Sequence, residues 1–121
     1  MKNVSVIKNE NALPTITIPY RSAILLTIHL QNVQAQRSEL GIVKDIIERI
    51  GVNKNITELT RDIGGGRAMI NPTVDGFDDV EVQLAPQEIR VILKTLNEIT
   101  ITVNDLIWIE PLASQLEKKV G

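Results

Sequence analysis

The spacing of the aliphatic residues is the feature that most constrains the fold of this chain. Only Tyr20, Phe77 and Trp108 are aromatic, so the core must be built from Ile, Leu, Val and Ala. In several segments these residues recur every three or four positions, which places them on one face of an α-helix. The clearest segment is 38–50, which starts with Ser38 and Glu39 and is followed by Gly51. It carries an apolar stripe of Leu40, Val43, Ile46, Ile47 and Ile50.

Further helices are expected around this one. Residues 86–98 begin with Pro86, which suits the first helical position, and carry a Leu/Ile stripe. Thr102 to Asp105 has capping spacing, so a helix is expected to follow to the C-terminus, broken or kinked at Pro111. Residues 20–35 favour helix, although alternation at 27–30 leaves a strand open there. A short helix is expected over 56–63, and a loop over 64–79.

Segments rich in Val, Ile and Thr predict a small sheet. Residues 3–8 and 15–18 indicate an N-terminal β-hairpin or two edge strands, and 80–84 alternates apolar and polar residues as a half-buried strand does. The predicted fold is therefore α+β: one mainly helical domain over residues 1–121 with a small antiparallel sheet, formed by the N-terminal hairpin and the strand near 80–84.

Composition excludes several kinds of chemistry. The chain has no cysteine and one histidine, His29, which removes thiol nucleophiles, the common catalytic triads and the usual zinc sites. Four acids lie close together, but their spacing does not match a calcium-binding loop; they are Asp75, Asp78, Asp79 and Glu81. We therefore expect no enzyme, no catalytic residues, no metal and no cofactor. The chain has no cysteine and no long apolar run. Both features favour a cytoplasmic protein outside the membrane.

The charge distribution argues against nucleic acid as the partner. The net charge is −2, and the basic residues are dispersed singly apart from Lys118 and Lys119. A DNA-binding regulator is nevertheless kept as an alternative, built on the segments 38–50 and 56–63. Its available cations are Arg37, Lys44, Arg49, Lys54 and Arg61.

The stretch from Gly64 to Asn71 is the most unusual in the chain. Three consecutive glycines cost backbone entropy and commonly serve positive φ angles or close approach of a ligand. Backbone amides of Gly64, Gly65 and Gly66 together with Arg67 are suited to a phosphate or carboxylate, which Asn71 would orient. A small phosphorylated or nucleotide-like ligand here is one hypothesis, and a hinge or helix stop is the other.

The last helix carries more apolar residues than one stripe needs. Its apolar positions from 106 to 116 spread widely around the helix, with Leu106, Ile109, Ala113, Leu116 and Val120 expected on the buried side. Burial on more than one side is therefore expected, by the chain's own domain or by a second copy. The predicted interface residues are Trp108, Ile109, Leu112 and Leu116.

Residues 80–119 combine an acidic strand, the segment Ala85-Pro86-Gln87-Glu88-Ile89, a Leu/Ile helix, a Thr-rich break and a final helix. This arrangement resembles small accessory proteins of phages and prophages in AT-rich bacteria. The resemblance implies a role without catalysis, in virion assembly or in neutralising a host factor or signal. The leading interpretation is a self-associating interaction protein, with contacts made by apolar helix faces around Trp108 and the 38–50 helix. Its expected partner is a second copy, and another protein or a small anionic ligand are the alternatives.

Overall fold

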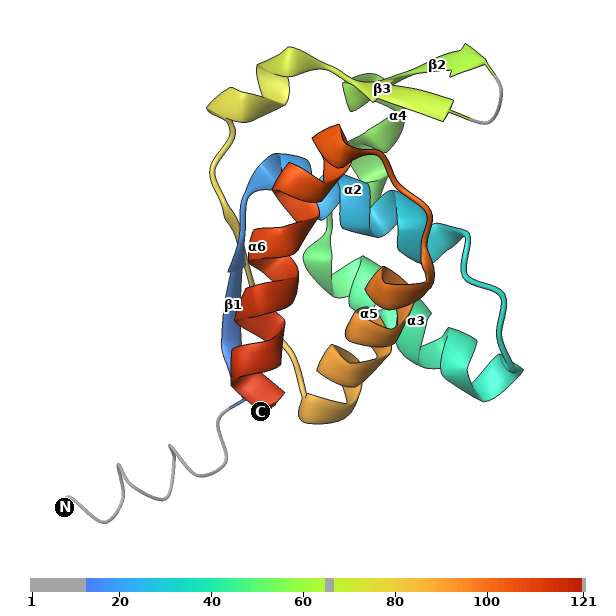
Figure 1. Ribbon diagram of the computed structural model, residues 1–121, viewed down its shortest axis with the longest axis vertical. Coiled ribbons are helices and arrows are strands. Elements are labelled where there is room, and N and C mark those ends of the chain that lie inside the picture. Colours follow the sequence, from blue (N-terminus) through green and yellow to red (C-terminus); the bar gives the residue numbers. More distant parts are fainter. Residues whose placement is uncertain (1–12, 65–66, 121) are drawn as a thin grey trace, which may run out of the picture.

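The structure is a computed structural model that describes residues 13–64 and 67–120, and it confirms a mainly helical α+β fold. In this part of the chain, four long helices form the bulk of the fold, and two short antiparallel ladders pack with them (Figure 1). The helices are α2 (Tyr20–Gln31), α3 (Arg37–Ile50), α5 (Pro86–Glu98) and α6 (Val103–Val120), with a single-turn α4 (Ile56–Leu59) preceded by a 3-10 turn η1 (Asn53–Asn55).

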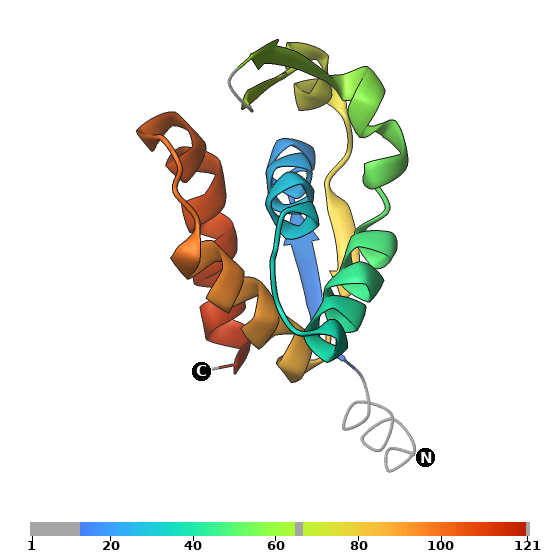
Figure 2. The ribbon, with the colours of Figure 1, turned by 90° about the vertical axis from the view of Figure 1, so that its right-hand side faces the viewer.

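Helix α2 lies at the centre of the helical part of the molecule. It contacts α3, α5 and α6, and in Figure 2 it lies between α6 on one side and α3 on the other. Seven of its twelve residues are buried, from Ser22 to Thr27 and Leu30. A helix that is apolar almost all round has to be surrounded by other elements. The segment predicted at 20–35 is helical from Tyr20 to Gln31, so the strand considered at 27–30 is not formed.

The ends of the other helices follow local rules. Gly51 takes a φ of 78° and closes α3, as a C-terminal glycine commonly does. The Glu88 carboxylate accepts the Ala85 amide at 2.7 Å and so satisfies the start of α5. Thr102 accepts the Asp105 amide through its hydroxyl at 3.3 Å and caps α6. The predicted helices at 38–50, 86–98 and the C-terminus are confirmed, but α6 continues through Pro111 without the break that was considered there.

The first sheet joins β1 (Thr15–Ile18) to β4 (Val80–Gln83) in antiparallel register, with Ile16 opposite Val82. The pairing of 15–18 with the 80–84 strand agrees with the predicted sheet, whereas the predicted strand at 3–8 lies outside the described residues. The Gln115 side chain of α6 binds β1 from the side away from β4. Its amide donates to the Thr17 carbonyl at 2.9 Å and its oxygen accepts the Thr17 amide at 3.0 Å.

Two predictions in the middle of the chain are wrong. The segment 56–63 is helical only to Leu59, and the segment 64–79 is not a plain loop. Instead β2 (Thr60–Gly64) and β3 (Arg67–Ile70) form a hairpin, followed by a 3-10 helix η2 (Pro72–Gly76). Pairing explains the difference: the Asn71 amide donates to the Leu59 carbonyl at 2.8 Å and extends the ladder to the end of α4. Propensity within 56–63 contains no information about this partner strand.

The buried aliphatic residues form one cluster that includes side chains from both ladders and from each α-helix named above. Among residues 13–64 and 67–120, no helix combines the length and apolar character needed to cross a bilayer.

Candidate functional site

Helix α6 packs on α5, α2 and β1 through one face. Three of the residues predicted for an interface, Ile109, Leu112 and Leu116, are on this face and are buried in the chain's own core. Ile109, for example, is only 3% exposed. These three side chains therefore have almost no surface left to offer a second copy.

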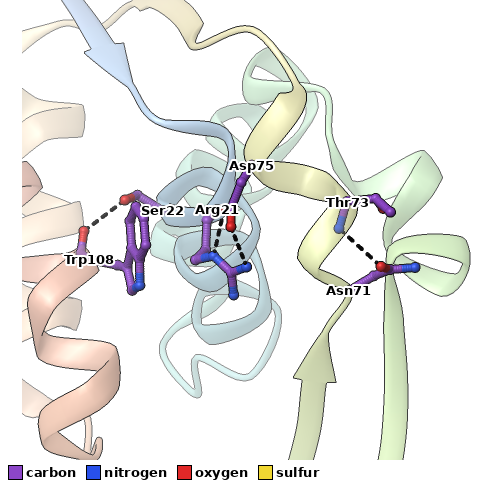
Figure 3. Close-up of polar contacts among 6 residues, drawn as sticks. All are labelled: Arg21, Ser22, Asn71, Thr73, Asp75 and Trp108. Carbon is purple, nitrogen blue, oxygen red and sulfur yellow. Dashed lines mark hydrogen bonds and ion pairs between the residues drawn. The ribbon is translucent and has the colours of Figure 1, made fainter.

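Trp108, the fourth predicted interface residue, is partly buried and held against α2 (Figure 3). The Arg21 guanidinium carbon lies 5.3 Å from the centroid of the Trp108 ring, within the range of a cation–π contact. The backbone carbonyl of Trp108 accepts a hydrogen bond from the buried Ser22 hydroxyl at 2.8 Å. Trp108 thus contributes mainly to the attachment of α6 to α2.

The same arginine links α2 to η2. Arg21 donates from Nε and Nη2 to the two Asp75 carboxylate oxygens at 3.0 and 3.1 Å (Figure 3). This hydrogen bonding lowers the pKa of Asp75 below its ordinary value. Nearby, the rings of Tyr20 and Phe77 have centroids 4.7 Å apart. The three aromatic residues of the chain are therefore distributed around the start of α2.

The exposed apolar residues of α6 are in its first turns and differ from those predicted. Val103 is 76% exposed, Leu106 42% and Ile107 62%. Positions i, i+3 and i+4 share one side of a helix, so these three side chains form a single apolar stripe, called here the α6 stripe. Leu106 was expected on the buried side and is exposed instead, because the face of α6 that meets α5 and α2 is set by Ile109, Leu112 and Leu116.

Three more exposed apolar side chains, Ile63, Met69 and Phe77, are on β2, on β3 and just after η2. Figures 1 and 2 both show the hairpin, η2 and the start of α6 at the same end of the molecule, away from the C-terminus. Among the described residues, six of the eight large apolar side chains that are exposed therefore belong to elements at this end. The concentration of apolar surface here could be anticipated only in part from the excess of apolar residues in the last helix.

The glycine-rich stretch begins at the last residue of β2. Gly64 ends β2 with a φ of 90°, and its amide donates to the Asp62 carboxylate at 2.8 Å. Gly65, Gly66 and the side chain of Arg67 lie outside the described part of the chain. The Asn71 side chain accepts the Thr73 amide at 3.1 Å and so caps η2 (Figure 3).

Asn71 also lines a cavity of about 410 Å³ beside the hairpin. The other side chains around it include one cation and one anion, Arg61 and Glu58. Arg61 is the cation that the described part of this lining offers to an anionic ligand. The described residues therefore bring together only part of the predicted ligand site.

A second ion pair joins three elements of the fold. Arg49 donates from Nη1 to Glu88 Oε1 at 2.6 Å and to the Gln83 carbonyl at 3.0 Å, joining α3 to β4 and α5. The Arg49 hydrogen bond lowers the pKa of Glu88. Because residues 60–64 form a strand, the helix pair of the DNA-binding alternative is not present. Within the described ranges, no group of three or more His, Asp or Glu residues is arranged to hold a metal ion.

Protein-family models, curated proteins and solved structures were compared with the chain, and none of them matches it. Its function is therefore inferred from its own geometry.

Proposed function

We propose that this protein is a non-catalytic, self-associating interaction protein and that the α6 stripe is its contact surface. The observation that carries the proposal is the exposure of Val103, Leu106 and Ile107 on one side of a helix whose opposite side is packed in the core. Single exposed apolar residues are ordinary on protein surfaces, but a contiguous group is typical of an interaction site. Removing this surface from water would stabilise a complex by about 25 cal/mol for each Å² buried.

A second copy is the partner that the charge pattern favours. The net charge of −2 creates little repulsion between two copies. Anionic membranes and nucleic acids would instead require clustered cations, and the two residues flanking the stripe, Asp105 and Glu110, are acidic. Association through a self-complementary patch around a twofold axis is also the commonest form of protein assembly. A phage or prophage assembly component, or a protein that neutralises a host factor, would use a surface of this kind.

The affinity is expected to be modest. Specific interfaces usually bury roughly 800 Å² on each partner, and three aliphatic side chains supply a fraction of that. Dissociation in the micromolar range is therefore expected, unless the exposed residues of the hairpin join the contact. Concentration-dependent measurements are required to detect such a complex.

Sedimentation velocity at about 1 to 100 µM protein, spanning the expected micromolar dissociation constant, tests the proposal. The wild type should change from monomer to dimer over this range, and Ile107→Lys should remain monomeric because it buries a charge in the contact. Leu40→Lys is the matched control, since Leu40 is an exposed leucine on α3. It should dimerise like the wild type. A wild type that stays monomeric throughout, or an Ile107→Lys variant that dimerises normally, would contradict the proposal.

A second candidate, from a different class, is binding of a small phosphorylated ligand by the stretch from Gly64 to Asn71. The cavity that Asn71 lines is the observation that favours it. Thermal unfolding with and without millimolar inorganic phosphate or a nucleoside diphosphate tests it, because a ligand that binds the folded state raises the midpoint. The rise should disappear in Arg67→Ala. No rise in the wild type would exclude these ligands.

A further inference from the structure

We infer that two copies pair through antiparallel α6 helices, with a twofold axis at Ile107 and with each Glu110 against the first turn of the other copy's α6. This inference rests on the proposed function and specifies its geometry. It depends on the order of exposed residues along α6, on the position of one carboxylate and on the cap of the helix.

The exposed side of α6 is self-complementary in this arrangement. Val103, Ile107 and Pro111 are spaced four residues apart, so they follow one side of the helix, and all three are exposed. In an antiparallel pair centred on residue 107, Ile107 meets Ile107 of the second copy and Val103 meets Pro111. Leu106 faces the side of Trp108 of the second copy. Apolar residues thus oppose apolar residues over two turns of helix.

The charges agree with the same register. Position 110 then lies opposite position 104 of the second copy, in the first turn of its α6. The first amides of a helix have no acceptor within the helix, and they create a partial positive charge that stabilises a nearby carboxylate. Thr102 already accepts the Asp105 amide. The amides of residues 103 and 104 precede that of Asp105. In the second copy, these two amides and the Asn104 side chain would interact with the exposed Glu110.

Other registers are less favourable. Moving the axis one turn toward the C-terminus, between residues 110 and 111, brings the two Glu110 carboxylates together and sets Ile107 against Ser114. Moving the axis one turn toward the N-terminus would place it at Val103, where the helix starts, so the contact would extend beyond the helix. A parallel pair would place like ends of the two helix dipoles side by side as well as the two carboxylates.

The cysteine-free chain allows the register to be read by single substitutions. Ile107→Cys should form a disulfide-linked dimer on mild oxidation, because the two positions face each other at the axis. Ser114→Cys should not, since the two positions would be roughly 21 Å apart along the helices. Leu40→Cys, on α3, measures the rate of random collision. A mixture of Glu110→Cys and Asn104→Cys should form the mixed dimer in preference to either symmetric dimer.

Charge reversal provides a second test. Glu110→Lys should weaken dimerisation roughly 3- to 10-fold, the range expected for replacing a favourable charge at a helix N-terminus by an unfavourable one. Glu117→Lys is the matched control, with the same change two turns further along α6, and should alter the dissociation constant less than about 2-fold because the effect is confined to the first turn.

The outcomes separate the geometry from the proposed function. A wild type that dimerises, with Ile107→Cys cross-linking no faster than Leu40→Cys, would overturn the antiparallel pairing while self-association stands. Efficient cross-linking of Ser114→Cys would overturn it in the same way and indicate the register one turn later. A wild type that is monomeric at all concentrations would overturn both.

Discussion

Two isoleucines of α6 illustrate the difference between its two faces. Ile109 is 3% exposed and packs in the core, whereas Ile107, two positions earlier in the same helix, is 62% exposed. The residue type, the helix and the local propensity are the same. One set of apolar residues in α6 attaches the helix to α2 and α5. The other set is exposed and, in the proposed function, contacts a second copy.

The largest expected effect is a direct test of this contrast. Ile109→Ala should lower the free energy of unfolding by about 2 to 5 kcal/mol, because it leaves a cavity in the core. Ile107→Ala should change it by less than about 0.5 kcal/mol, because its side chain is exposed in the monomer. Urea unfolding at a concentration below that of association measures both. Equal losses in the two variants would show that the two faces are not distinct.

The ion pair between Arg49 on α3 and Glu88 on α5 tests how strongly the packed side of the molecule is held together. Glu88→Gln should lower the free energy of unfolding by about 1 to 3 kcal/mol, since a charge-assisted hydrogen bond to Arg49 is weakened. The pKa of Glu88 is lowered in the folded state. Its contribution is therefore fully present above the ordinary glutamate pKa and is lost as the pH falls through the lowered one.

The pH dependence provides the control for this pair. Unfolding of the wild type should become easier as the pH falls below about 4.5, the ordinary value for glutamate. Glu88→Gln should show a smaller change over the same range, and Glu117→Gln, on an exposed position of α6, should follow the wild type. A profile for Glu88→Gln parallel to that of the wild type would contradict the assigned role.

Gln115 tests how the second half of α6 is held to the sheet. Gln115→Ala removes the two hydrogen bonds to Thr17 and should cost about 1 kcal/mol, because water replaces part of what is lost at this exposed site. Hydrogen exchange of the Thr17 amide should also accelerate. Glu117→Ala, two residues further along the helix, should leave that amide unchanged. Unaltered exchange in Gln115→Ala would show that the side chain does not protect the strand.

The smallest expected effect concerns His29, in the last turn of α2. Burial lowers the pKa of His29, partly opposed by the Asp105 carboxylate. A lowered pKa means that the unfolded state binds the proton more tightly, so stability should decline as the pH falls below the ordinary value of 6.5. His29→Gln should remove this decline above pH 5 without affecting the one due to Glu88. Unfolding midpoints measured across this pH range would detect it, and an unchanged decline in His29→Gln would contradict it.

The elements that sequence alone predicted correctly are those with local signals. Helix α3 has a stripe and a terminal glycine, α5 has Pro86 and a capping glutamate, and α6 has Thr102 at its start. The hairpin was missed because β2 depends on hydrogen bonds to β3, which no pattern within 56–63 reveals. Its glycines were considered as a ligand site or hinge, while Gly64 in fact provides the positive φ at the end of β2.

For the candidate site, periodicity showed that the last helix has an excess of apolar residues, but not which of them face the core. Trp108, Ile109, Leu112 and Leu116 were predicted for the interface, and the structure places the last three in the core. Val103, Leu106 and Ile107 are exposed instead. Helical spacing indicates which residues share a face, and only the neighbouring elements decide where that face points.

What the sequence determined by itself is therefore the class of the fold and the bounds of its main helices, because periodicity and capping act over a few residues. The hairpin, the central position of α2 and the choice of the exposed face of α6 were decided by the tertiary structure. Each depends on contacts between segments far apart in the chain, such as Arg21 with Asp75 and Gln115 with Thr17. Such contacts form only when the whole core assembles.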